Sequence, residues 1–174
     1  MSGAPPVRAF VALGSNLGER LANLGDAVRR LCAADGMEIT GSSRVYETAP
    51  VGPPQPDYLN AVIELRTTLL PRELLEACLR IEAEMGRVRD ERWGPRVIDL
   101  DLLTFDDQTI AEPDLTVPHP RMHQRAFVLI PLIELHPDPP LPGGRRLEDL
   151  RLQVDLRAVR PFAHSLPFAL PRSG

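Results

Sequence analysis

Apolar and polar positions alternate with two different periods along the chain, and the periods predict four strands and two helices. Apolar residues at every second position predict strands over residues 7–13, 38–47, 58–69 and 97–105. Apolar residues at helical spacing predict helices over 19–34 and 71–85. Pro71 suits the first position of the second helix, and Gly86 follows its end. Ser15 and Asn16 precede the first helix and are candidates for its N-cap.

The order strand, helix, strand, strand, helix, strand predicts a ferredoxin-like α+β fold. Such a fold has an antiparallel sheet with helices mainly on one face, so the other face is open for a site. Beyond it we expect a short edge strand at 109–110, a helix ending before Pro137 and a short helix over 146–152. We expect one domain over residues 1–159 and a poorly ordered tail over 160–174.

Composition and charge narrow the class of protein. The 174 residues are 43% hydrophobic and 25% charged, which is ordinary for a globular domain, and the net charge is −4. An acidic chain is not expected to bind nucleic acid generally. No apolar run reaches transmembrane length and no signal-peptide pattern is present, so we expect a cytoplasmic protein, without membrane contact, that acts as a monomer. Cys32 and Cys78 lie among apolar residues and are expected to be buried thiols.

The absence of lysine excludes several mechanisms. All 20 basic residues are arginine. A Walker A loop, the strand lysine of protein kinases and Schiff-base chemistry each require a lysine. If this chain binds phosphates, it must therefore use arginine, histidine, metal ions or backbone N–H groups.

Residues 86–105 contain the clearest candidate chemistry. Asp99 and Asp101 alternate with Ile98, Leu100 and Leu102 on the last predicted strand, so both carboxylates face one side. Residues two apart on a strand are about 6.5–7 Å apart. Two carboxylates this close repel each other unless a cation lies between them, and Mg²⁺ typically uses one or two carboxylates plus substrate phosphates. The alternative is a solvated strand face without a ligand.

Arginines precede this strand on a predicted loop. Arg87, Arg89, Arg92 and Arg96 lie within ten residues of one another, and guanidinium groups match phosphate oxygens. Trp93 among them is a flat ring that could stack on a heterocycle. Taken separately, an arginine-rich loop is compatible with a plain soluble surface, and a single tryptophan with a core position.

Together these residues resemble the 6-hydroxymethyl-7,8-dihydropterin pyrophosphokinase family. The segments that carry the resemblance come in family order, at 12–17 (ALGSNL), 56–61 (PDYLNA), 86–89 (GRVR), 91–96 (ERWGPR), 99–101 (DLD) and 117–119 (VPH). The resemblance covers residues 7–150 and implies a ferredoxin-like fold. It also implies transfer of pyrophosphate from ATP to the hydroxymethyl group of the pterin in folate biosynthesis, with release of AMP.

The resemblance also implies roles for individual residues. Asp99 and Asp101 would hold two Mg²⁺ ions, and with Arg87 and Arg96 they would be the catalytic residues. The residues on the ATP side would be Glu82, Arg87, Arg89, Arg92, Arg96, His119 and Arg125. The residues of the pterin pocket would be Thr48, Val51, Tyr58, Asn60, Trp93 and Phe127.

Two other functions are compatible with parts of the sequence. The same strand order serves RNA-recognition domains, although these use basic surfaces and exposed aromatic residues. A metal-dependent phosphodiesterase could be built on Asp99, Asp101 and His119. Turnover of ATP with the pterin separates the family activity from both alternatives.

Overall fold

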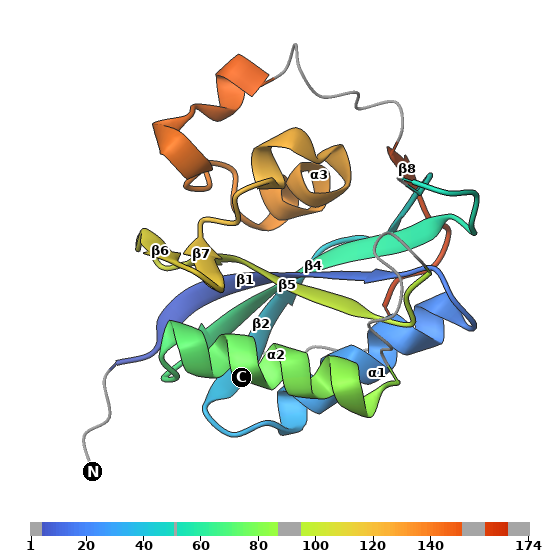
Figure 1. Cartoon of the computed structure of the whole chain (residues 1–174), viewed down its shortest axis with the longest axis horizontal. Coiled ribbons are helices and arrows are strands. Elements are labelled where there is room, and N and C mark those ends of the chain that lie inside the picture. Colours follow the sequence, from blue (N-terminus) through green and yellow to red (C-terminus); the bar gives the residue numbers. More distant parts are fainter. Residues whose placement is uncertain (1–4, 51, 87–94, 151–158, 167–174) are drawn as a thin grey trace.

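A computed structural model of the chain describes residues 5–50, 52–86, 95–150 and 159–166. It is a mixed α/β structure in which helices cover an antiparallel sheet (Figure 1). The helices are α1 (Arg20–Ala33), α2 (Pro71–Glu84) and α3 (Ala126–Leu135). Among the described helices, none has the length and apolar character needed to cross a bilayer.

In the described part of the chain the main sheet has six strands, and all of its pairs are antiparallel. The strands are β1 (Val7–Ser15), β2 (Met37–Ser42), β3 (Tyr46–Thr48), β4 (Tyr58–Thr67), β5 (Asp99–Phe105) and β8 (Val159–Pro161). Their order is β5-β1-β4-β3-β8, and β2 also pairs with β4. The first strand along the chain therefore lies inside the sheet, between β5 and β4, which are the two longest of the other described strands.

The two faces of the sheet are covered differently. Helices α1 and α2 lie against one face, and α3 lies against the other (Figure 1). Buried residues form one core cluster on the α1 and α2 side, which includes Leu13, Leu24 and Leu100. A second cluster joins Phe10, Val62 and Leu103 to α3. The face that we expected to be open is therefore covered in part by α3, although two of the three α-helices do share one face.

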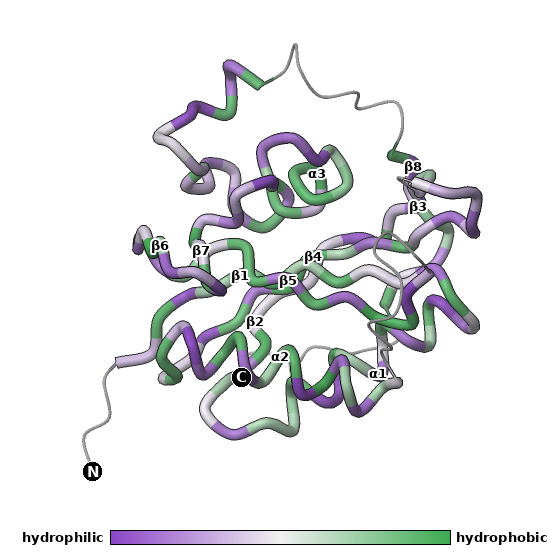
Figure 2. The backbone as a smooth tube through the Cα atoms, in the orientation of Figure 1, coloured by the Kyte–Doolittle hydropathy of each residue, from purple (hydrophilic) through white to green (hydrophobic). Residues whose placement is uncertain are grey.

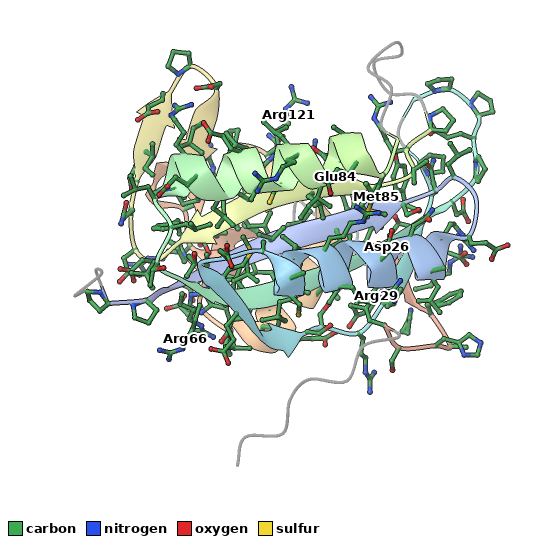
Figure 3. All side chains as sticks on the ribbon, turned by 90° about the horizontal axis from the view of Figure 1, so that it is seen from below. Asp26, Arg29, Arg66, Glu84, Met85 and Arg121 are labelled. Atoms are coloured by element: carbon green, nitrogen blue, oxygen red, sulfur yellow. The ribbon has the colours of Figure 1, made fainter. Side chains whose placement is uncertain are left out.

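Figure 2 shows the resulting distribution of hydropathy, with α3 and the central strands largely hydrophobic. Figure 3 looks onto the opposite layer, where α1 and α2 lie side by side. Arg30 connects these helices, because its guanidinium lies 3.3 Å from the Asp26 carboxylate and 2.9 Å from that of Glu84. The Arg30–Glu84 pair joins the two helices on their solvent side.

The predicted elements are largely confirmed, with one strand divided in two. The predicted strand over 38–47 is β2 followed by β3. Between them, Ser43 donates its N–H to the carbonyl of Val62, and its hydroxyl accepts the N–H of Val62. This side-chain bond replaces a regular ladder bond, so the strand is interrupted at that point. At the start of α2, Leu70 is the N-cap residue and Pro71 is the first helical residue. The N–H of Leu70 donates to the Glu73 carboxylate.

A hairpin and short 3₁₀ turns complete the described C-terminal part. The predicted edge strand near 110 is β6 (Ile110–Glu112), which pairs with β7 (Leu115–Val117) in a separate two-stranded sheet. The 3₁₀ turns are η1 (Met122–Gln124), η2 (Pro142–Gly144) and η3 (Leu147–Leu150). The short helix expected over 146–152 is η3 in its described part. The peptide bond between Val117 and Pro118 is cis.

The chain after residue 158 returns to the sheet. Strand β8 pairs with β3, and the N–H of Phe162 donates to the carbonyl of Val45. Leu166 is buried in the first core cluster. The boundary that we expected at residue 160 therefore falls inside β8. Residues 167–174 lie outside the described residues.

The two cysteines differ in their surroundings. Cys78 is fully buried on α2, and burial raises the pKa of its thiol to about 12. Cys32 is exposed on α1, so the expectation of a buried thiol is wrong there. Its position near the helix end faces away from the sheet, which the apolar character of its neighbours did not reveal.

Candidate active site

A pocket of about 480 Å³ opens on the α3 side of the sheet. Its walls come from the ends of β1 and β3, from the starts of β4 and β5, and from the segment that leads into α3. Among the described residues, nine that the sequence indicated line this pocket, namely Thr48, Tyr58, Asn60, Arg96, Asp99, Asp101, His119, Arg125 and Phe127. Its volume lies within the range of small-molecule sites, which is roughly 300–1,000 Å³.

The strand register brings the polar residues of the floor together. Gly14 of β1 lies opposite Asn60 of β4 and Asp99 of β5. Directly opposed residues on antiparallel strands share a face, so these three positions form one row across the sheet. Ala12 and Asp101 belong to the next row. Residues almost 90 positions apart in the sequence therefore meet on one surface.

The two aspartates occupy the floor as the alternation predicts. Leu100 is buried in the core beneath the strand, whereas Asp99 and Asp101 are half-buried on the pocket side. Arg96 lies close by, with its Nε 3.8 Å from Oδ1 of Asp99. Within the described ranges, no group of three or more acidic, histidine or cysteine side chains could hold a metal. Two carboxylates fit Mg²⁺, which completes its coordination with waters and substrate phosphates.

Arginines supply positive charge around these carboxylates. Arg96, Arg121 and Arg125 all line the pocket. The guanidinium carbon of Arg125 lies 5.7 Å from the ring centroid of Phe127, within the range of a cation–π contact. A mixed site with carboxylates below and guanidinium groups around it suits a polyphosphate that carries a divalent cation.

Sequence reasoning missed Arg121 and Gln124, which also line the pocket. Both belong to the turn between His119 and Arg125, two residues that the sequence did indicate. The 3₁₀ geometry of η1 places Gln124 near the start of α3. The sequence did carry a signal for Arg121, because an arginine that lies between His119 and Arg125 on a short segment is itself a candidate phosphate ligand.

His119 is held in a defined orientation. Its backbone N–H donates to the carbonyl of Leu103, 2.8 Å away. The ring Nδ1 lies 3.1 Å from the backbone nitrogen of Arg121 and accepts its N–H. In the neutral ring the proton is then on Nε2, which leaves an N–H donor for a ligand. Burial lowers the pKa of His119, and the charges of Arg125 and Arg121 also lower it, against an opposing effect of Asp101.

This depressed pKa predicts a pH dependence of folding stability. The unfolded chain binds a proton on His119 below about pH 6.5, while the folded chain binds it only at lower pH. The contribution of His119 is therefore fully present above about pH 6.5 and is lost as the pH falls below that value. Without metal or nucleotide, wild type should lose more stability than His119→Gln between about pH 7.5 and pH 5.5, measured by urea unfolding. Equal losses would contradict the assignment of a neutral, half-buried ring.

One wall of the pocket carries an amide and a hydroxyl next to aromatic rings. Asn60 is buried, and its Nδ2 donates to Oγ1 of Thr48 at 2.7 Å. A Cβ added at Gly14 would lie 3.1 Å from Oδ1 of Asn60 and 3.5 Å from the ring of Tyr58. Glycine at this position therefore keeps the amide and the ring accessible from the pocket.

Glu82, which the resemblance places on the ATP side, does not line this pocket. It is 2% exposed on α2, and its Oε2 accepts the N–H of Leu100 at 3.2 Å. Its carboxylate therefore approaches β5 from the side of α1 and α2. The indicated residues Val51, Arg87, Arg89, Arg92 and Trp93 lie outside the described residues.

The turn before α1 does not cap that helix. The helix begins at Arg20 after Glu19 and has no side-chain hydrogen bond at its N-cap. The expectation that Ser15 or Asn16 caps it is therefore wrong. The Asn16 side chain bonds instead to Gln55, to Pro56 and to the pocket residue Arg96.

Comparisons with known proteins agree on one family. The family model described as 7,8-dihydro-6-hydroxymethylpterin-pyrophosphokinase (HPPK) matches residues 10–137. A 2-amino-4-hydroxy-6-hydroxymethyldihydropteridine pyrophosphokinase of Synechocystis sp. is 45% identical over 159 residues, covering 91% of this chain and 82% of the relative. The Bacillus subtilis protein of the same name is 48% identical over 128 residues, covering 73% and 77%.

Solved structures show the same fold. A crystal structure of an HPPK-DHPS in complex with substrates matches with a TM-score of 0.69 at 12% identity and covers 91% of this chain. The Plasmodium falciparum HPPK-DHPS with pteroate has a TM-score of 0.58 at 15% identity over 74% of this chain. This chain spans less than half of those chains, 47% and 40%. By its sequence match and its fold, the chain belongs to the 7,8-dihydro-6-hydroxymethylpterin-pyrophosphokinase family and is a pyrophosphokinase enzyme.

Proposed function

We propose that this chain transfers pyrophosphate from ATP to 6-hydroxymethyl-7,8-dihydropterin in a Mg²⁺-dependent reaction of folate biosynthesis, giving AMP and the pterin diphosphate. The observation that carries the proposal is the row formed by Asp99, Gly14 and Asn60 on the floor of one pocket. This row places Asp99 next to an amide suited to the edge of a heterocycle, and Asp101 in the next row completes a carboxylate pair for a metal-bound polyphosphate. The names of the relatives support the same reaction.

The nucleotide half is built from Asp99, Asp101 and the arginines. Two bound Mg²⁺ ions would neutralise charge on the phosphates and orient the phosphates. Arg96, Arg121 and Arg125 bind phosphate oxygens, and His119 donates its Nε2–H to one of them. We assign Arg87, Arg89 and Arg92 to the same phosphates. Arg87 and Arg96 are assigned as catalytic residues. Glu82 is assigned to the nucleoside side. These further assignments are supported by the family resemblance alone.

The pterin half is built from Thr48, Tyr58, Asn60 and Phe127. With one amide hydrogen on Thr48, Asn60 still offers a second N–H and its Oδ1. A donor and an acceptor side by side can read the edge of a pterin, and aromatic rings cover its flat faces. Trp93 and Val51 are assigned to the same half from the resemblance.

In this reaction the main roles of the chain are to position both substrates and to stabilise the charge of the transition state. The hydroxymethyl oxygen of the pterin attacks the β-phosphorus of ATP, the bond between the α- and β-phosphate groups breaks, and AMP leaves. Side chains that fix both substrates in line supply much of the rate enhancement. Preorganised guanidinium groups stabilise the charge that develops on the transferred group.

The strand order supports the ferredoxin-like fold, and the position of α3 bears on the expected partners. The order β5-β1-β4-β3, with helices between the strands, fits the ferredoxin-like arrangement, here extended by β8. We still expect a single domain that acts as a cytoplasmic monomer and has no nucleic-acid or membrane partners. Coverage of one sheet face by α3 favours an enzyme pocket over an open RNA-binding sheet.

Purified protein mixed with ATP, Mg²⁺ and the dihydropterin provides the test. AMP and pterin diphosphate should form in equal amounts, and only when all three components are present. Formation of ADP or free phosphate, or AMP release that is independent of the pterin, would refute the proposal. Cleavage of nucleic acid without pterin turnover would favour the phosphodiesterase alternative.

Gly14→Ala should weaken pterin binding selectively. The new Cβ would press on Oδ1 of Asn60 at 3.1 Å, so the amide must shift away from its position in the pocket. We expect KM for the pterin to rise about tenfold, with KM for ATP nearly unchanged. Gly41→Ala on β2 is the matched control, because its Cβ would meet Glu64 and Leu135 instead. Equal effects of the two substitutions on pterin KM would contradict the placement of the pterin.

A further inference from the structure

The turn between β1 and α1 contains a buried asparagine that joins the pocket residue Arg96 to the segment just before β4. Asn16 is 1% exposed. Its Nδ2 donates to Oε1 of Gln55 at 2.8 Å and to the carbonyl of Pro56 at 3.0 Å. Its Oδ1 accepts the N–H of Arg96 at 2.7 Å, and its own N–H donates to the carbonyl of Arg96 at 3.0 Å. One side chain thus connects three segments that are distant in sequence.

These bonds end on both halves of the site. Pro56 lies two residues before Tyr58, which lines the pterin wall. Arg96 lines the phosphate wall and lies three residues before Asp99. Both amide hydrogens and the carbonyl oxygen of Asn16 are engaged, so the carboxamide is matched to its surroundings. Aspartate would keep the acceptor and lose the donors, and alanine would lose both.

We propose that Asn16 is a positioning residue that sets the separation between the pterin wall and the phosphate wall. This inference rests on the proposed function, because the two walls are defined by the two substrates. Asn16 lines no part of the pocket and acts through Arg96 and Pro56. In-line transfer requires the attacking oxygen and the phosphorus to be held within a few tenths of an ångström, and a displacement of about 1 Å can cost a hundredfold in rate.

Asn23 provides a matched control in the same turn. Its Nδ2 donates to Oγ of Ser15 at 3.2 Å and to the carbonyl of Leu17 at 2.8 Å. Asn23→Ala therefore removes two hydrogen bonds of this turn without touching either wall. Asn16→Ala removes the bonds to both walls, and Asn16→Asp removes only those to Gln55 and Pro56.

We expect Asn16→Ala to lower kcat by about ten- to a hundredfold, whereas Asn23→Ala changes kcat by no more than about twofold. In Asn16→Asp the N–H of Arg96 keeps its acceptor, but the Pro56 carbonyl loses its donor. KM for the pterin should then rise more than KM for ATP. Equal losses of kcat in the two alanine variants would reduce Asn16 to a structural role. If Asn16→Ala does not fold, equal rises of both KM values in Asn16→Asp overturn the proposal.

Amide exchange measures the same contact without substrates. The N–H of Arg96 should exchange faster in Asn16→Ala than in wild type and remain protected in Asn16→Asp, as followed by NMR. Unchanged exchange in Asn16→Ala would overturn the positioning role. The proposed function has a separate test. It is wrong if the wild-type protein forms no AMP with Mg²⁺, ATP and the dihydropterin.

Discussion

Replacing Asp99 and Asp101 together by asparagine is expected to lower kcat by at least about a thousandfold, with little change in folding stability. The two carboxylates are the acidic side chains of the described pocket. Asparagine keeps their size but removes the negative charge that a divalent cation needs. A metal contributes several kcal/mol of charge stabilisation to phosphoryl-type transfer, and each 1.36 kcal/mol corresponds to a tenfold change in rate.

The measurement is AMP formation at increasing Mg²⁺ concentrations for the double variant and for both single variants. The single variants should need more Mg²⁺ for half-maximal rate. Asp107→Asn is the control, because Asp107 lies in the exposed turn that follows the same strand. If the double variant retained wild-type activity at every Mg²⁺ concentration, the metal assignment would be wrong.

Arg96→Ala is expected to give the second largest loss, about a hundredfold in kcat. Arg96 lines the phosphate wall beside Asp99, and removing one preorganised donor to a charged transition state costs on the order of a hundredfold or more. Arg96→Lys should recover only part of the rate, because lysine keeps the charge but loses the planar pair of donors.

Arg66→Ala serves as the control for this series. Arg66 is exposed on β4 and projects away from the structure in Figure 3. Its removal should leave kcat and both KM values within about twofold of wild type, as for most surface substitutions. Should Arg96→Lys match wild type, a simple positive charge would suffice, and the two-donor contact with phosphate would be contradicted.

The part of the site that sequence predicts well depends on local periodicity. Alternation along 97–105 places Asp99 and Asp101 opposite the buried Leu100, and the structure confirms this arrangement. The same alternation puts Asn60 on the pocket face of β4. Strand pairing then brings these residues together, which the predicted order of elements already favoured.

Features that depend on contacts between distant segments were not predicted. Strand β8 is three residues long and contains Pro161, and a proline in a short run argues against a strand. It forms because the edge of β3 is free to accept it and because Phe162 and Leu166 reach the core. Local sequence likewise makes Asn16 a candidate helix cap, because it does not show that Pro56 and Arg96 lie beside it.

The most direct test of this account is a crystal structure with Mg²⁺, a non-hydrolysable ATP analogue and the dihydropterin. We predict Mg²⁺ on Asp99 and Asp101, triphosphate oxygens on Arg96, Arg121 and Arg125, and the pterin beside Asn60 with its hydroxymethyl oxygen directed at the β-phosphorus. A nucleotide bound elsewhere, or metal ions distant from both aspartates, would contradict the account.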